Sequence, residues 1–151
     1  MDLGLEGKTA LVTGGSKGIG AASAKSLAAE GCNVIIVSRA EADLQKAKAA
    51  IAGAANVRIE TLAADLSKGE EVKRVAAAFP EIDILVNNAG AIRGGSLTDV
   101  DEARWRFDWD LKVFGYINMC REYYPRMAKR GGGVIVNVIG AAAHTKPAGY
   151  I

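Results

Sequence analysis

The sequence has few of the side chains that build disulfide scaffolds or metal centres. It contains two cysteines and one histidine in 151 residues. Cys32 and Cys120 lie far apart and lack the spacing of zinc ligands, so we expect two reduced, buried thiols and no bound metal. These absences argue against a disulfide scaffold and against a zinc site.

An excess of charge of one sign and long apolar runs are missing as well. The formal net charge is +2, and acidic and basic residues are interspersed, which is typical of a mixed solvated surface rather than of a nucleic-acid-binding patch. No apolar run reaches the roughly eighteen residues that a membrane-spanning helix needs. The first predicted strand begins next to Lys8, which leaves no room for an apolar signal segment. We therefore expect a cytoplasmic protein without nucleic-acid or membrane partners.

Apolar strands and helical segments alternate along the chain. The predicted strands cover residues 9–12, 33–38, 57–62, 82–87 and 134–138, and the predicted helices cover residues 19–30, 41–53, 67–79 and 102–130. Ser67 and Glu70 have the spacing of a capping box at the start of the third helix. Residues 34–37 are apolar throughout, as expected of a strand covered on both sides. The alternation predicts one α/β domain, a parallel sheet with helices on both faces.

The stretch from Lys8 to Gly20 has the order strand, glycine loop, helix start. Glycines allow backbone N–H groups to approach a pyrophosphate closely, and the following helix directs its positive end at the same place. Gly14, Gly18 and Gly20 are spaced differently from the general dinucleotide fingerprint. An ordinary tight turn between strand and helix is therefore the alternative to a phosphate-binding loop.

Two segments together resemble a known family. Residues 13–20 resemble the cofactor loop of the short-chain dehydrogenase/reductase superfamily, and residues 87–90, Asn-Asn-Ala-Gly, resemble its second signature. The resemblance extends from Gly7 to about Gly140. It implies a Rossmann-type, doubly wound parallel sheet in three layers and nicotinamide-dependent redox chemistry on a small carbonyl or alcohol substrate. Residues 1–151 are then a single NAD(P)-binding domain.

The cofactor contacts follow from this resemblance and from the ends of the predicted strands. The predicted cofactor-binding residues are Gly14, Ser16, Lys17, Gly18, Ile19, Gly20, Ser38, Arg39, Asp65, Leu66, Asn88, Ala89 and Gly90. An open α/β sheet places its ligand beyond the carboxyl ends of its strands, where these residues lie. Two alternatives stay open: Asp65 could instead cap a turn, and residues 88–90 could simply end the fourth strand.

The end of the second strand indicates which dinucleotide is preferred. Where a carboxylate would bind the ribose 2′-hydroxyl of NAD, this chain has Ser38 and Arg39. The guanidinium of Arg39 presents a planar set of donors suited to a 2′-phosphate, and Lys17 would add a second cation. We therefore predict NADP, with NAD less favoured. The alternative is that both side chains are ordinary solvated surface charges.

The catalytic residues follow the family pattern only in part. In the family, a Tyr exchanges a proton with the substrate, a Ser holds the carbonyl oxygen, a Lys lowers the pKa of the Tyr, and an Asn supports a water relay. The resemblance places Asp110 at the Asn position and Gly140 at the Ser position, and leaves Tyr150 as the acid or base. Gly140 has no hydroxyl, and His144 and Thr145 are the nearby candidates to replace it. The family Lys would lie beyond the last residue.

Two functions from different classes therefore stay open. The first is an NADP-dependent oxidoreductase that reduces a carbonyl or oxidises a secondary alcohol. The second is a dinucleotide-binding sensor or scaffold with lost or altered catalysis, which Asp110 and Gly140 keep open. A methyltransferase on a similar fold would not explain the Asn-Asn-Ala-Gly segment.

Two apolar surfaces lack a predicted partner. The doubly wound dinucleotide fold has about six strands, whereas this sequence predicts five, so the strand over 134–138 would be an uncovered apolar edge. The helix over 102–130 is apolar on too much of its circumference for one sheet contact, and Pro125 is expected to bend it. We interpret the chain as lacking the C-terminal part of its domain. The long helix would pair subunits in a homo-oligomer, as the resemblance implies, or be covered by the missing part.

Overall fold

The computed structural model describes residues 2–53, 55–90 and 94–140. In chain order its elements are β1 (Thr9–Thr13), α1 (Gly18–Ala29), β2 (Asn33–Ser38), α2 (Glu41–Ala52), β3 (Ile59–Ala63), α3 (Gly69–Ala78), β4 (Ile84–Asn87), α4 (Glu102–Trp109), the π-helix η1 (Asp110–Gly115), α5 (Tyr116–Lys129) and β5 (Val134–Asn137). Within these residues five strands form one parallel sheet in the order β3-β2-β1-β4-β5. The predicted α/β fold with a doubly wound parallel sheet is confirmed.

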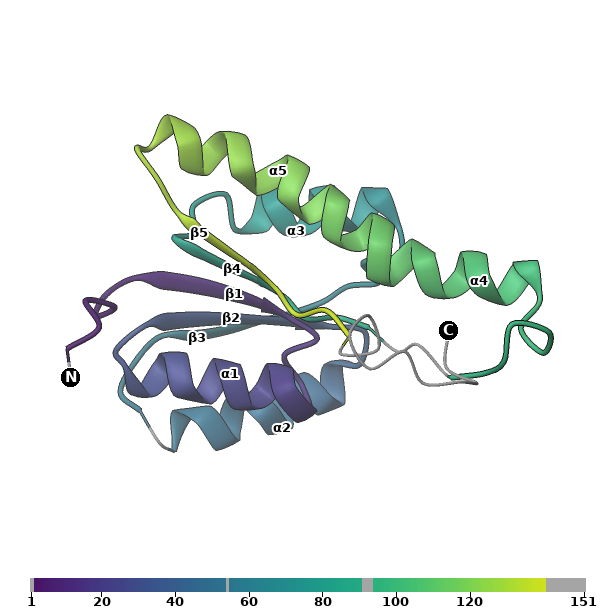
Figure 1. Cartoon of the computed structure of the whole chain (residues 1–151). Helices are drawn as coiled ribbons and strands as arrows, with labels where there is room; N and C mark the ends of the chain where they lie inside the picture. Colours follow the sequence, from purple (N-terminus) through teal and green to yellow (C-terminus); the bar gives the residue numbers. More distant parts are fainter. Residues whose placement is uncertain (1, 54, 91–93, 141–151) are drawn as a thin grey trace.

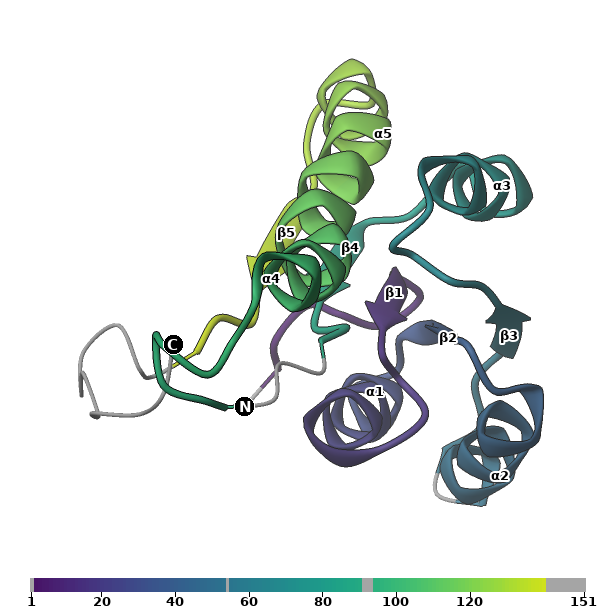
Figure 2. The same ribbon diagram turned by 90° about the vertical axis from the view of Figure 1, so that its right-hand side faces the viewer.

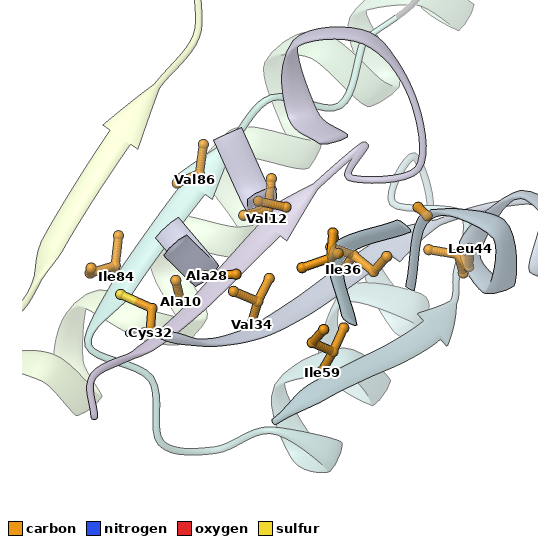
Figure 3. Packing of buried hydrophobic residues seen from close by; sticks show 13 residues of the cluster. Ala10, Val12, Ala28, Cys32, Val34, Ile36, Leu44, Ile59, Ile84 and Val86 are labelled. Carbon is orange, nitrogen blue, oxygen red and sulfur yellow. The ribbon is translucent and has the colours of Figure 1, made fainter. Parts of the chain in front are cut away.

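Helices cover both faces of this sheet. Figure 1 shows α1 and α2 against one face and α3 and α5 against the other, and Figure 2 shows the same layers from the end of the sheet. Successive residues of β1 point to opposite faces. Ala10 and Val12 therefore pack with α1 and α2 (Figure 3), whereas Leu11 packs with α3 and α5. All three side chains are fully buried, so the loop after β1 starts from a fixed position.

β5 lies at the edge of the sheet in the described part of the chain. It pairs in parallel with β4, and its Val134 and Val136 are 54% and 43% exposed. The sequence predicted this uncovered apolar strand. Because an exposed edge strand offers unpaired backbone groups and apolar side chains together, it is a surface that proteins usually cover.

The long helix predicted over 102–130 is interrupted. It begins as α4, widens into the π-helix η1 at Asp110, and continues as α5 from Tyr116. The irregular segment is therefore at 110–115 rather than at Pro125, which lies inside α5. A Cβ added to Gly115 would lie 2.9 Å from the Leu66 carbonyl oxygen, so only glycine lets η1 approach the loop after β3 so closely. No helix in the three described segments is long and apolar enough to cross a membrane.

The predicted capping box at the start of the third helix is wrong. α3 begins at Gly69, its N-cap residue is Lys68, and no side chain caps it. Ser67 instead donates its hydroxyl to the Asp65 carboxylate at 2.8 Å. The Ser67 hydroxyl is therefore bonded to Asp65 and not to the backbone N–H group that a capping box would use. The helix begins at Gly69 instead.

Candidate functional site

A cavity of about 300 Å³ lies at the carboxyl ends of β1, β2 and β4. The chain runs from β1 outward to β3 and then returns to the other side of β1 at β4, so this is the place where the strand order reverses. Eight of the predicted cofactor-binding residues line the cavity: Gly14, Ser16, Lys17, Ser38, Arg39, Leu66, Ala89 and Gly90. The fold therefore gathers residues from the loops after β1, β2, β3 and β4 around one cavity.

The glycine loop is shaped by the close approach of the loop after β4. Gly14 has a φ of +65°, and a Cβ there would lie 2.9 Å from both the side-chain amide nitrogen of Asn88 and the Cα of Ala89. A Cβ on Gly20 would collide with the Gly14 carbonyl. Gly18 and Ile19 begin α1 outside the cavity wall. Glycine at 14 and 20 thus lets the two predicted signatures pack against each other.

Hydrogen bonds fasten these two loops together. The buried Thr13 hydroxyl accepts from the backbone N–H groups of Asn88, at 2.9 Å, and Ala89, at 3.0 Å. The Asn88 side-chain amide donates to the carbonyls of Thr13, at 3.0 Å, and Gly14, at 3.3 Å. Asn88 therefore supports the glycine loop and does not line the cavity. Sequence reasoning missed Thr13, although a buried hydroxyl at the end of a central strand is a signal for such a role.

The two predicted cations, Lys17 and Arg39, differ in whether they form an ion pair. The Lys17 ammonium forms an ion pair with the Asp43 carboxylate at 2.7 Å. Within the described residues, Arg39 has no ion-pair partner. Asp43 is in the first turn of α2 and lines the same cavity. The sequence has no carboxylate at the end of β2, and the acidic residues at the start of the next predicted helix were the available signal for this one.

Asp65 and Leu66 take different places after β3. Leu66 is buried and lines the cavity. Asp65 lines a neighbouring cavity of about 460 Å³, which also contains Arg39. Its carboxylate accepts hydrogen bonds from both the backbone N–H and the hydroxyl of Ser67. The side chain of Asp65 thus caps a turn, which was the structural alternative for this residue.

The predicted catalytic residues are not gathered at this cavity within the described residues. Asp110 is exposed at the start of η1, beside an aromatic cavity that contains Trp105 and Trp109. Gly140 is exposed after β5. Tyr150 lies outside the described residues, as do His144 and Thr145.

A lysine that the sequence did not single out lies close to the loop after β4. The Lys112 ammonium donates to the Val138 carbonyl at 2.6 Å and to the Tyr116 hydroxyl at 2.7 Å. A Cβ on Gly90 would lie 2.8 Å from the Lys112 side chain. Burial lowers the pKa of Lys112 and raises the pKa of Tyr116 to about 12. Lys112 therefore connects η1 to the end of β5 beside the cavity.

A cavity beyond the carboxyl ends of the strands of a doubly wound sheet is where α/β proteins of this class bind their ligands, and comparison with known proteins identifies the family. Residues 8–151 match the family model described as short chain dehydrogenase. The chain therefore belongs to the short-chain dehydrogenase/reductase family, which confirms the resemblance seen in the sequence.

Relatives within this family have several activities. D-beta-hydroxybutyrate dehydrogenase of Cupriavidus necator is 37% identical over 97% of this chain and 59% of its own length. The 3-oxoacyl-[acyl-carrier-protein] reductase FabG of Staphylococcus epidermidis is 34% identical over 95% of this chain and 62% of its own length. The structure of L-sorbose reductase from Gluconobacter frateurii complexed with NADPH and L-sorbose has a TM-score of 0.91 and 33% identity, over 99% of this chain and 59% of that one. The chain thus spans 59–62% of the length of these proteins.

Proposed function

We propose that the protein is an NADP(H)-dependent oxidoreductase that reduces a carbonyl group or oxidises a secondary alcohol. The observation that carries this proposal is the cavity at the carboxyl ends of β1, β2 and β4, where the glycine loop lies beside Lys17 and Arg39. The similar L-sorbose reductase structure is a complex with NADPH, which supports the choice of cofactor.

The described residues fit an adenine dinucleotide. Ser38 lines the cavity, and its buried hydroxyl has no hydrogen-bond partner among these residues. Buried polar atoms are nearly always hydrogen-bonded, so an oxygen of a bound ribose or phosphate is a fitting partner for this hydroxyl. Arg39 follows it directly and offers donors for a 2′-phosphate. Donors for both parts of a phosphorylated ribose are therefore adjacent.

In the proposed reaction the nicotinamide, when bound, supplies or accepts the hydride. The glycine loop and the start of α1 would hold the pyrophosphate, because backbone N–H groups and the helix dipole both favour an anion there. Arg39 and Lys17 would hold the 2′-phosphate. Tyr150 would pass the proton to or from the substrate oxygen as general acid or base.

We also propose that two copies associate through α4, η1 and α5. Phe107 and Phe114 on this segment are 68% and 51% exposed. Exposed large apolar side chains are surfaces that proteins usually cover, and a second copy of the chain would cover them here. Light scattering of the parent and of a Phe107→Ser, Phe114→Ser variant should show a loss of oligomer in the variant.

A sensor or scaffold that binds the dinucleotide without turnover is the second candidate. It is favoured by the exposure of Asp110 outside the cofactor cavity and by the missing hydroxyl at Gly140. A relay through Asp110 would need that carboxylate near the substrate.

Two measurements separate these candidates. Fluorescence titration with NADPH and NADH tests the dinucleotide site, and assays of the full-length protein with a panel of ketones test turnover. We expect NADPH to bind more tightly than NADH and at least one ketone to be reduced. Tight NADPH binding without turnover would favour the sensor, and the absence of binding would contradict both.

A further inference from the structure

We propose that Asp43 sets the preference between the two nicotinamide dinucleotides by competing with the 2′-phosphate for Lys17. This inference rests on the proposed NADP-binding function and names a residue that limits it. Asp43 is the carboxylate among the residues that line the cofactor cavity, and its ion pair with Lys17 measures 2.7 Å.

The pair joins two helix starts across the edge of the cavity. Lys17 is the N-cap residue of α1, and Asp43 lies in the first turn of α2. The side chain of Lys17 is 72% exposed and that of Asp43 is 26% exposed. The exposed side chain of Lys17 can therefore change its conformation and reach a ligand, while the Asp43 side chain is packed against the protein surface that lines the cavity. Lys17 can leave the pair, but Asp43 stays at the cavity.

The two dinucleotides should respond to this carboxylate in opposite ways. The 2′-phosphate of NADPH is an anion that must draw Lys17 away from Asp43, and giving up this ion pair is unfavourable. The ribose of NADH has a hydroxyl in the same place, and a carboxylate can accept a hydrogen bond from it. Asp43 therefore reduces NADPH affinity and leaves NADH affinity equal or higher. Arg39, without an ion-pair partner in the described residues, still favours the phosphate.

The test compares Asp43→Asn with Glu41→Gln in the full chain. Both substitutions remove one negative charge from the first turn of α2, but Glu41 does not line the cavity and its carboxylate contacts Gln45. Dissociation constants for NADPH and NADH are measured by fluorescence at fixed salt. We expect Asp43→Asn to tighten NADPH binding up to about fivefold, with NADH binding unchanged or weaker, and Glu41→Gln to change the affinity for either dinucleotide by less than about twofold. Equal effects of the two substitutions on NADPH would overturn the proposal.

A double-mutant cycle with Lys17→Met tests the route. If Asp43 acts by holding Lys17, the gain from Asp43→Asn should shrink to about twofold or less in the Lys17→Met background. An undiminished gain would show that Lys17 is not involved and would overturn the proposed competition. If the parent binds neither dinucleotide, the proposed function and this inference both fail. If the parent prefers NADPH and Asp43→Asn behaves as the parent does, only the inference fails.

Discussion

Thr13 and Asn88 are joined by two hydrogen bonds at the carboxyl ends of the neighbouring strands β1 and β4. The Asn88 N–H donates to the Thr13 hydroxyl at 2.9 Å, and the Asn88 side-chain amide donates to the Thr13 carbonyl at 3.0 Å. Thr13 ends β1, and Asn88 follows β4. Because the glycine loop begins at the next residue after Thr13, this pair fixes the distance between the two walls of the cofactor cavity.

Thr13→Val should destabilise the protein. The substitution keeps the branched shape and removes the hydroxyl, which leaves the N–H groups of Asn88 and Ala89 without their acceptor. An unsatisfied buried donor costs about 1–3 kcal/mol. Urea unfolding should show this loss, and the exposed Thr98→Val is the matched control, with a change of less than about 0.5 kcal/mol. Equal unfolding free energies for the two variants would mean that the Thr13 hydroxyl does not support the loops.

Arg39→Asp should weaken NADPH binding and hardly affect NADH. A hydrogen bond to a charged group contributes about 1.5–3 kcal/mol, which corresponds to about tenfold or more in the dissociation constant. Both cofactors are titrated against the parent and the variant by fluorescence. Arg58→Asp provides the same charge reversal at a residue outside both cavities that Arg39 lines. Equal affinities of the parent for NADPH and NADH would contradict the predicted preference.

The sheet could be predicted because its strands carry a local signal. β2 has the predicted bounds, since an apolar run there is bounded by Asn33 and Ser38. β3 was predicted to start at 57 and starts at Ile59, because the end of a strand depends on the neighbour with which it pairs. The cavity followed from the sheet, since loops after parallel strands meet at one edge.

Features that depend on contacts between distant segments could not be predicted. The π-helix η1 has no apolar periodicity that would distinguish it from an α-helix in the sequence. It occurs where Gly115 lies close to the Leu66 carbonyl. The ion pair of Lys17 with Asp43 depends on the spacing of two helix starts that only the folded sheet sets. The sequence shows which charges are available but not which of them are paired.

The pH dependence of stability should report on Tyr116. Burial raises the pKa of this tyrosine from 10.0 to about 12. A group with a raised pKa binds more protons in the folded state, so its contribution to stability is complete below pH 10 and is lost as the pH rises through about 12. The difference in unfolding free energy between the parent and Tyr116→Phe should therefore shrink over this range.

The same pH series with Tyr124→Phe provides the control. Tyr124 is 66% exposed on the same helix, α5. Guanidinium unfolding at several pH values between 9 and 12 measures both differences. A difference for Tyr116→Phe that stays constant across the series would show that burial of this hydroxyl does not couple to folding.

Tyr150→Phe should abolish carbonyl reduction in the full-length protein. The substitution keeps the ring and removes only the hydroxyl, so packing is preserved while general acid catalysis, typically worth about a hundred- to ten-thousandfold, is lost. NADPH affinity should stay nearly unchanged, because the residues proposed to bind the dinucleotide belong to the cavity after β1, β2 and β4.

Single-turnover oxidation of NADPH separates the chemical step from product release and is the measurement of choice for this variant. Tyr124→Phe, which removes an exposed hydroxyl from α5, is the control and should turn over as the parent does. If Tyr150→Phe also turned over normally, the proton would have to come from another group, and His144, the one histidine in the sequence, would be the next residue to replace. A loss of both turnover and NADPH binding would instead mean that Tyr150 supports the cofactor site and that the proton donor is still to be found.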